Sequence, residues 1–143
     1  MASIFSKIIA GEIPAHKVAE NSSYLAFLDI NPLVMGHVLV IPKVEVDYIF
    51  DLDDKTYLGL QAFAKTIAIG LKKAIPCTRI GVAVVGLEVP HVHIHLVPMN
   101  TMDDLNFTRK KLHPSDQELK KTAELIRKEL DNDEAGWSDI KGE

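Results

Sequence analysis

The strongest constraint on the fold of this chain is the segment at residues 91–98, HVHIHLVP, in which histidine alternates with apolar residues. In a β-strand, successive side chains point to opposite faces, so this alternation predicts a strand with one apolar and one polar face. His91, His93 and His95 should therefore project from the same side of a sheet. Histidine makes up only 6 of the 143 residues, so the composition does not account for this spacing.

A second apolar segment, residues 79–85, precedes this strand and is separated from it by residues 86–90. A parallel crossover needs a dozen or more residues, so the two strands should be antiparallel neighbours. Helical periodicity predicts a long helix at about residues 53–75, and a capping box formed by Ser115 and Glu118 predicts the start of a C-terminal helix. This order predicts an α+β fold with a largely antiparallel sheet. Further short strands are expected at residues 17–20, 24–30 and 37–43.

At 143 residues, the chain is long enough for one hydrophobic core and too short for two ordinary domains. We expect one domain across residues 1–143, with a core at about 3–130 and a polar, flexible tail at 131–143. The net charge of −4 offers no global attraction to nucleic acid or to an anionic membrane, and no segment approaches the ~20 apolar residues of a membrane span. The single cysteine, Cys77, and the lack of a signal-peptide pattern favour a cytoplasmic protein without nucleic-acid or membrane partners.

Three neighbouring histidines are unusual core residues, because each buried polar group without a partner costs about 1–3 kcal/mol. A solvent-facing row is possible but gives no reason for the choice of histidine. In a metal site, neutral imidazoles two residues apart on a strand can share a zinc ion. The backbones of His91 and His95 would be about 13 Å apart on a strand, so one ion is not expected to bind all three imidazoles.

In a covalent mechanism, one imidazole attacks an electrophile while its neighbours orient it and stabilise charge. Histidine suits this role because a pKa of about 6.5 leaves a neutral, nucleophilic ring nitrogen at neutral pH. His37 favours this interpretation, since it stands at the start of an apolar strand after a turn that contains Asp29 and Asn31. Taken singly, these three are ordinary strand-edge and turn residues.

Together, these segments resemble the histidine triad (HIT) superfamily of nucleotidyl hydrolases and transferases, in particular its Hint-like branch. The family signature is His-φ-His-φ-His-φ-φ, where φ is apolar, and residues 91–97 match every position. Residues 3–15 (SIFSKIIAGEIPA), 27–32 (FLDINP) and 36–43 (GHVLVIPK) resemble the N-terminal segment, the ribose loop and the strand with its upstream histidine. The resemblance implies a HIT-like fold, with a five-stranded antiparallel sheet per subunit, one long helix and a C-terminal helix. It also implies a homodimer with a continuous ten-stranded sheet.

The resemblance further implies a two-step mechanism. His93, the middle histidine, would attack the α-phosphorus of a nucleotide and form a nucleotidyl-histidine that water then cleaves. The other ring N–H of His93 would be donated to a backbone carbonyl, which fixes the tautomer. His91 and His95 would hydrogen-bond the phosphate and the leaving group, and His37 would support the triad.

The same resemblance implies two groups of nucleotide-binding residues. Asp29 would bind the ribose hydroxyls, helped by the backbone near Ile30 and Asn31. For each residue of the purine slot, a place in the hydrophobic core is the alternative, and for Ile8 and Leu39 the two roles weigh equally. The apolar slot for the purine would be formed by Ile4, Phe5, Ile8, Phe27, Ile30 and Leu39.

Two departures from the family pattern bear on function, and the first concerns metal. Many bacterial relatives carry Cys-x-x-Cys near the N-terminus and an additional histidine, which form a structural zinc site with the first triad histidine. Here Ser3 and Ser6 occupy the cysteine positions, and Glu45 occupies the histidine position. Hydroxyls are poorer zinc ligands than thiolates, so we expect no bound metal and no cofactor.

The second departure lies just before the triad. Relatives carry an amide side chain on the preceding strand, then a glycine-rich turn with a glutamine and a hydroxyl residue that contact the phosphate and leaving group. This chain has Ala83 and Val84 at the amide position, Leu87 for the glutamine and Val89 for the hydroxyl residue, and its turn is shorter. Such contacts act mainly on the transition state, so we expect slow turnover or an unusual leaving group.

The main hypothesis is therefore a purine nucleotide-binding hydrolase that cleaves a P–N or P–O bond at the α-phosphate, for example in a nucleoside phosphoramidate. The alternative is a nucleotide-binding or interaction module that kept the triad but turns over little, because the phosphate-contact loop is altered. A histidine metal site is the third hypothesis, and it predicts stoichiometric bound zinc.

Overall fold

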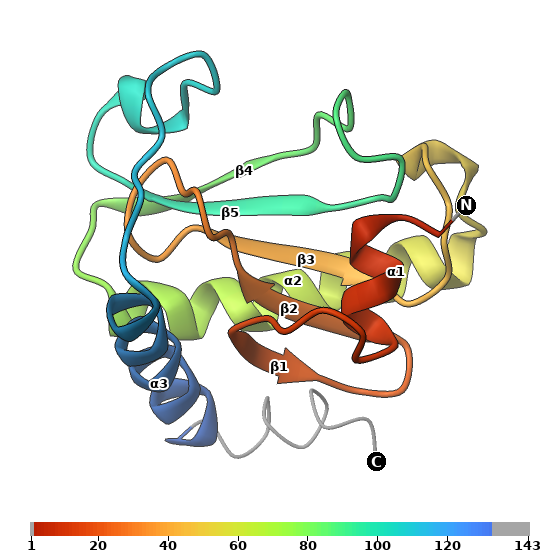
Figure 1. Cartoon of the computed structure of the whole chain (residues 1–143), viewed down its shortest axis with the longest axis horizontal. Coiled ribbons are helices and arrows are strands. Elements are labelled where there is room, and N and C mark those ends of the chain that lie inside the picture. The colour runs from red at the N-terminus through yellow and green to blue at the C-terminus, as the bar shows by residue number, and fades with distance from the viewer. Residues whose placement is uncertain (1, 133–143) are drawn as a thin grey trace.

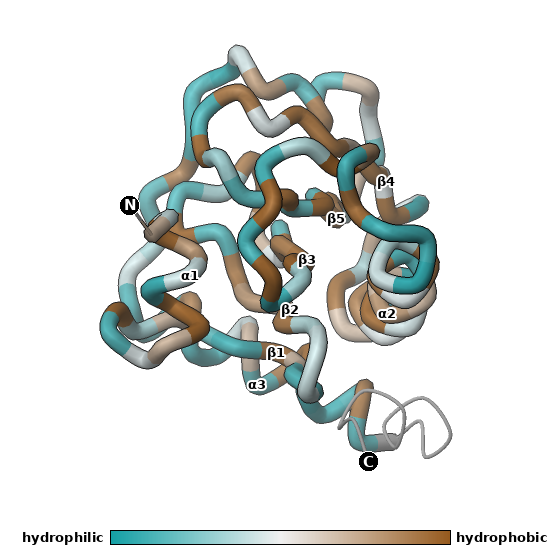
Figure 2. The backbone as a smooth tube through the Cα atoms, turned by 90° about the vertical axis from the view of Figure 1, so that its right-hand side faces the viewer, coloured by the Kyte–Doolittle hydropathy of each residue, from teal (hydrophilic) through white to brown (hydrophobic). Residues whose placement is uncertain are grey.

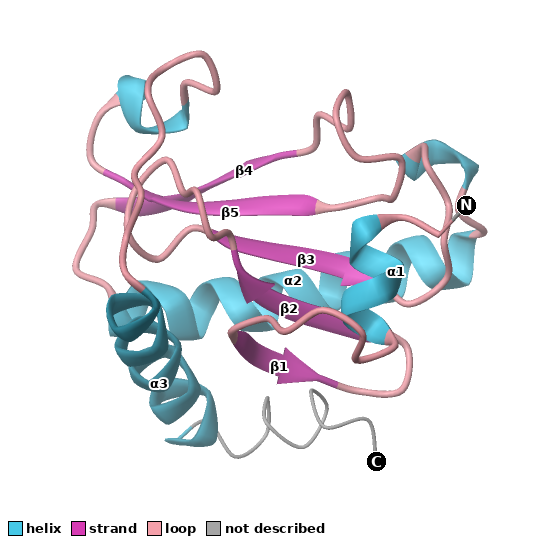
Figure 3. Cartoon of the chain, viewed as in Figure 1, coloured by secondary structure: helices cyan, strands magenta, loops and turns pink. Residues whose placement is uncertain are grey.

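The computed structural model describes residues 2–132. In this part of the chain, five antiparallel strands form one sheet in the order β1-β2-β3-β5-β4, as Figures 1 and 3 show. This architecture confirms the expected α+β fold and five-stranded antiparallel sheet. The strands are β1 (Lys17–Glu20), β2 (Tyr24–Leu28), β3 (Val38–Pro42), β4 (Arg79–Ala83) and β5 (Ile94–Met99). The helices are α1 (Ile4–Ile9), α2 (Asp54–Ala74) and α3 (Asp116–Asn132), with short 3₁₀ helices η1 (Ile49–Asp51) and η2 (Met102–Leu105).

The strand predicted at residues 91–98 begins only at Ile94. Before that point, the His91 N–H donates a hydrogen bond to the Val89 carbonyl at 2.8 Å, a turn contact that keeps the backbone of His91 out of the strand ladder. Only His95 lies within β5, so the prediction that one strand carries all three histidines is wrong at its start.

Although β5 is the last strand in the sequence, it lies between β3 and β4. His95 is opposite Leu39 of β3 and opposite Ala83 of β4. The antiparallel pairing of β4 with β5 confirms the prediction made from their short link. The central place of β5 brings the histidine row beside the start of β3.

The two faces of the sheet bury separate apolar clusters, because alternate residues of each strand point to opposite sides. In β3, Val38 and Val40 belong to the cluster on the α2 side. Leu39 and Ile41 belong to the cluster on the α1 side. Figure 2 shows α1 and α2 on opposite sides of the strands.

The C-terminal helix α3 begins as the sequence predicts. The Ser115 N–H donates to Glu118 Oε1 at 2.9 Å, and the Glu118 N–H donates to Ser115 Oγ at 3.1 Å, which completes the capping box. Arg127 Nη1 ties α3 to β1 by donating to the Lys17 carbonyl at 2.6 Å. The flexible tail expected from residue 131 falls, from residue 133 on, outside the described residues.

The described helices include none with the length and apolar character needed to cross a membrane.

We predict that the packing of α3 contributes strongly to stability. Ile126 is fully buried, whereas its neighbour Leu125 is 53% exposed. Ile126→Ala should therefore lower the free energy of unfolding by about 2–5 kcal/mol, and Leu125→Ala should change it by less than about 0.5 kcal/mol. Urea denaturation of the two variants provides the comparison, and equal effects would contradict this packing.

Candidate active site

The pairing of β3 with β5 places His37, which directly precedes β3, beside His95. His37 Nε2 and His95 Nδ1 are 2.9 Å apart. The Leu33 N–H donates to His37 Nδ1 at 3.1 Å, so this nitrogen must be the acceptor and the proton of neutral His37 lies on Nε2. His37 therefore donates to His95 Nδ1, and the proton of neutral His95 lies on Nε2. The backbone of Leu33 thus sets the tautomers of both rings.

His93 is oriented by a second backbone contact. Its Nδ1 is 2.7 Å from the His91 carbonyl oxygen, which can only accept a hydrogen bond. The proton of neutral His93 is therefore on Nδ1, and Nε2 carries the free lone pair. The ring packs edge-on against Phe5, with a centroid distance of 5.1 Å, and lies 4.9 Å from the His95 ring. His93 thus has the tautomer that a nucleophile needs.

His91 has a different environment, since it is fully buried and both ring nitrogens are engaged within the protein. Nε2 donates to the Pro42 carbonyl at 2.9 Å, and Nδ1 accepts from the Ser3 hydroxyl at 2.8 Å. Glu45 Oε1 accepts from the Ser3 N–H at 2.7 Å and from Ser6 Oγ at 2.6 Å. The positions that correspond to the zinc ligands of relatives therefore do meet in space, and they are joined by hydrogen bonds.

A cavity of about 240 Å³ lies beside His93. It brings together three predicted site histidines, the predicted ribose-binding acid and residues from two loops. Its lining comprises Asp29, His37, Val85, Gly86, Leu87, Glu88, His93, His95, Phe107, Thr108 and Lys111.

Asp29 reaches this cavity from the turn after β2. Its Oδ1 accepts the Asn31 N–H at 2.9 Å, and its Oδ2 lies 3.9 Å from His37 Nε2. Burial raises the pKa of the Asp29 carboxyl above its ordinary value, although the Asn31 N–H and the charge of Lys111 oppose this effect. The Asn31 side chain points elsewhere, because its Oδ1 lies 3.1 Å from His113 Nδ1.

The six residues predicted for the purine slot divide into two groups. Phe5, Ile8, Phe27 and Leu39 are buried together in the cluster between α1 and the sheet. Ile4 and Ile30 are 49% and 60% exposed. The buried group reaches the site through Phe5, which contacts the His93 ring.

Residues 100–112, which no sequence feature indicated as part of the site, close one side of the cavity. Phe107 packs edge-on against His95, with a centroid distance of 4.7 Å, and Thr108 and Lys111 also line the cavity. No periodicity or motif marks this segment, because it consists of one short 3₁₀ turn and irregular backbone. Its one aromatic residue, Phe107, and its two lysines, Lys110 and Lys111, a short distance after the triad, were the available signals.

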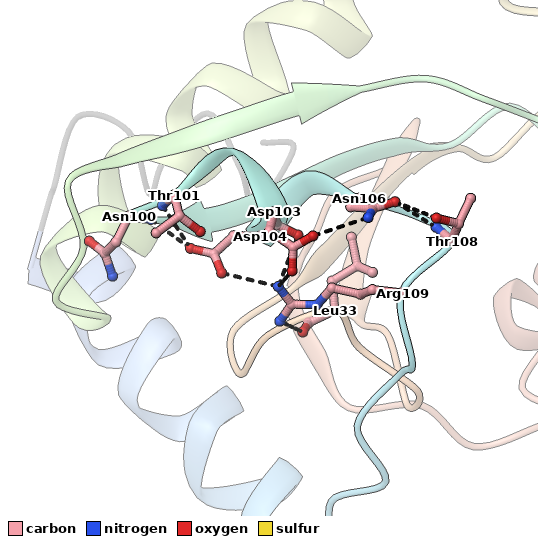
Figure 4. Close-up of polar contacts among 8 residues, drawn as sticks. All are labelled: Leu33, Asn100, Thr101, Asp103, Asp104, Asn106, Thr108 and Arg109. Atoms are coloured by element: carbon pink, nitrogen blue, oxygen red, sulfur yellow. Dashed lines mark hydrogen bonds and ion pairs between the residues drawn. The ribbon is translucent and has the colours of Figure 1, made fainter.

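Arg109 anchors this segment to the turn before His37, as Figure 4 shows. Its Nη2 donates to the Leu33 carbonyl at 2.7 Å, and its Nη1 contacts Asp103 Oδ2 and Asp104 Oδ1, each at 3.2 Å. The Leu112 N–H adds a backbone contact to the Pro32 carbonyl at 2.9 Å. The segment is therefore held against the same turn that positions His37.

Three buried histidines of the site, His37, His91 and His95, have a lowered pKa and are neutral near pH 7. Burial lowers the pKa of His37 to about 3 and the pKa of His95 to about 4, and the nearby positive charge of Lys111 contributes to both shifts. Burial also lowers the pKa of His91, against the opposing effect of the Pro42 carbonyl. The tautomers set by the backbone therefore describe the working state of these rings.

Asp29, His37 and His95 could hold a metal ion by proximity, since each offers one ligand atom and these atoms lie within 4.8 Å of one another. However, His37 Nε2 carries the proton that it donates to His95 Nδ1. An ion between the two rings would have to break this bond and move that proton. The donor set therefore fits a hydrogen-bonded chain better than a metal centre.

We predict that His37 and His95 remain neutral from about pH 8 to about pH 5, because burial opposes their protonation. Side-chain nitrogen NMR should show an Nε2–H tautomer for both rings. A ring that titrates near pH 6.5, the ordinary value, would contradict this proton arrangement.

The same shifts set the direction of a stability change. Between pH 6.5 and the lowered values of about 3 and 4, the unfolded chain binds protons that the folded chain does not. These two groups should therefore lower stability as the pH falls below 6.5, by up to about 1.4 kcal/mol per pH unit each, with no loss above it. Urea denaturation between about pH 7.5 and pH 5.5 measures this slope, in a range where ordinary carboxylates stay ionised.

Comparison with known proteins agrees with this geometry. Residues 10–102 match the HIT domain family. The chain is 39% identical over 113 residues to an uncharacterized HIT-like protein of Borreliella burgdorferi, with 74% of this chain and 81% of that protein covered. It is 38% identical over 98 residues to adenosine 5'-monophosphoramidase HNT1 of Saccharomyces cerevisiae, with 68% of this chain and 62% of the yeast protein covered.

The fold is also that of solved family structures. A Hit-like protein from Bartonella henselae superimposes with a TM-score of 0.79 at 30% identity, and the match covers 89% of this chain and 95% of that one. The family match spans the sheet, the long helix and the histidine row, and the structural match extends to most of the chain. This chain therefore belongs to the HIT domain family.

Proposed function

We propose that this protein is a purine nucleotide-binding hydrolase or nucleotidyl transferase that acts on nucleoside monophosphate conjugates. It would cleave a P–N or P–O bond at the α-phosphate, and nucleoside phosphoramidates are the favoured substrate class. Family membership and the yeast relative, which is named as an adenosine 5'-monophosphoramidase, support this proposal. We place the activity in the cytoplasm, which suits a chain with a single cysteine.

The observation that carries the proposal is the hydrogen bond from His93 Nδ1–H to the His91 carbonyl. It leaves Nε2 as the nucleophilic nitrogen of a ring that lines the cavity. The carbonyl oxygen would also stabilise the positive charge that the ring acquires when it is nucleotidylated. In this role, His91 acts through its backbone, and its buried side chain positions that backbone.

In the proposed first step, His93 Nε2 forms a bond to the α-phosphorus, and the P–N bond of the phosphoramidate breaks. When the nitrogen of the conjugate is protonated, the leaving group departs as a neutral amine and takes the electron pair of that bond. In the second step, water attacks phosphorus and releases a proton to the solvent, and the electron pair of the P–His bond returns to His93. The products are the amine and a nucleoside monophosphate.

His95 would stabilise the reacting phosphoryl group with its Nε2–H. The chain from the Leu33 N–H through His37 to His95 holds this donor in place without any positive charge on the rings. A preorganised donor is effective because it does not reorient when charge develops. Asp29 would accept hydrogen bonds from the ribose hydroxyls, and the Phe5 cluster with Ile4 and Ile30 would contact the purine.

We predict a covalent intermediate at His93. Intact-protein mass spectrometry after brief mixing with an adenosine phosphoramidate should show a nucleotidyl adduct, and AMP should accumulate. His93→Ala should abolish the adduct and lower AMP release by about 10³-fold or more, because it removes the nucleophile. His16→Ala is the matched control, since His16 contacts Asp116 and does not line the cavity.

AMP release that survives in His93→Ala would overturn the assignment of the nucleophile. Tight AMP binding without an adduct or turnover in the wild type would favour the nucleotide-binding module, with Leu87 and Val89 in place of phosphate-contacting residues as its explanation.

We also propose that two copies form a homodimer through β4. This strand is at the edge of the sheet, and Val82 on it is 58% exposed. The neighbouring surface of α2 is apolar between its lysines, with Ala68 and Ile69 beside Ile80 of β4. Edge pairing of β4 with its copy would cover these residues and extend the sheet to ten strands.

Light scattering after gel filtration should give about twice the chain mass of 15.9 kDa. Val82→Glu should shift the protein toward the monomer, because it introduces a charge into the paired surface. Val44→Glu is a control of equal chemistry, since Val44 is 53% exposed and lies outside β4. A wild-type mass near that of one chain would refute the dimer.

A further inference from the structure

The side of the cavity formed by the loop after β4 offers a phosphate no hydrogen-bond donor from its side chains. The loop after β4 contributes Val85, Gly86 and Leu87, none of which has a polar side chain. Leu87 is 89% exposed, and its side chain carries no hydrogen-bond donor. A phosphate bound here must therefore find its hydrogen-bond donors on other elements.

The charge of the cavity lining also disfavours the binding of a phosphate. Asp29 and Glu88 bring two carboxylates, while His37 and His95 are neutral near pH 7. Lys111 is the one lysine or arginine in the lining. Without it, an anionic substrate would enter a cavity whose fixed charges are negative.

We propose that Lys111 is a phosphate-binding residue, and that residues 100–112 supply the contacts that the loop after β4 lacks. This inference rests on the proposed function, because it assigns the α-phosphate of that substrate to the ammonium group. Lys111 Nζ donates to the Phe107 carbonyl at 2.7 Å, which uses one of its three N–H donors. The others can be directed to non-bridging phosphate oxygens of a ligand in the cavity that Lys111 lines.

The structure gives Lys111 a defined position, which separates it from an ordinary surface lysine. Its contact with Phe107 fixes Nζ to the residue whose ring packs on His95. Arg109 holds the segment to the Leu33 carbonyl (Figure 4). The N–H of the same Leu33 donates to His37. Leu33 therefore holds both the segment that carries Lys111 and the hydrogen-bonded pair of His37 and His95.

Isothermal titration of AMP and of adenosine tests the assignment. Lys111→Met removes the charge and keeps most of the side-chain length, so AMP affinity should fall about tenfold or more, as expected for a lost charge-assisted hydrogen bond. Adenosine affinity should stay unchanged, because adenosine has no phosphate. Lys111→Arg should restore most of the AMP affinity, and the salt dependence of AMP binding should weaken in Lys111→Met.

Lys110→Met is the matched control, since Lys110 is exposed, carries the same charge and does not line the cavity. Equal AMP affinities of Lys110→Met and Lys111→Met would overturn the assignment of Lys111. A parallel loss of adenosine affinity in Lys111→Met would also overturn it, because it would indicate a structural role of the Phe107 contact. Failure of the proposed hydrolase activity is distinct, since it is measured on the wild-type protein as the absence of AMP release from the phosphoramidate, whatever the AMP affinities of the lysine variants.

Discussion

The antiparallel pairing of β3 with β5 is the interaction on which the candidate site depends. It places the last strand of the sequence at the centre of the sheet and brings residues 58 positions apart, His37 and His95, within 2.9 Å. The same pairing sets Leu39 opposite His95. The apolar cluster under α1 therefore continues directly into the histidine row. A shift of register by one residue would turn these side chains to the other face.

Within this frame, backbone groups decide what each imidazole can do. Leu33 donates to His37 and sets a chain that ends in an Nε2–H on His95, while the His91 carbonyl accepts from His93 and leaves its Nε2 free. His91 has no ring nitrogen left for a ligand, because the Pro42 carbonyl and the Ser3 hydroxyl engage both. The three rings are therefore held differently: His95 presents an Nε2–H donor, His93 has a free Nε2, and His91 has no free ring nitrogen.

The network around His91 also connects the N-terminal helix to this arrangement. Ser3 caps α1 by accepting the Ser6 N–H, and Glu45 joins both serines to the loop after β3. Since the His91 carbonyl accepts the hydrogen bond from His93 Nδ1–H, the position of α1 contributes to the orientation of His93. Hydrogen bonds among Ser3, Ser6, Glu45 and His91 therefore hold the start of α1 to the histidine row.

The sequence alone determined the elements of this protein that depend on neighbouring residues: the long helix, the Ser115 capping box, the antiparallel β4–β5 pair and the alternation that identifies the histidine row. Resemblance added the expected places of His37 and Asp29. The start of β5 at Ile94 was not predictable, because a turn contact of His91 overrides the alternating pattern. Nor were the proton positions of His37 and His95 or the place of Lys111, which only the tertiary structure decided. They depend on contacts such as that of Arg109 with Leu33, 76 residues apart, and the direction of a hydrogen bond follows from folded geometry rather than from residue type.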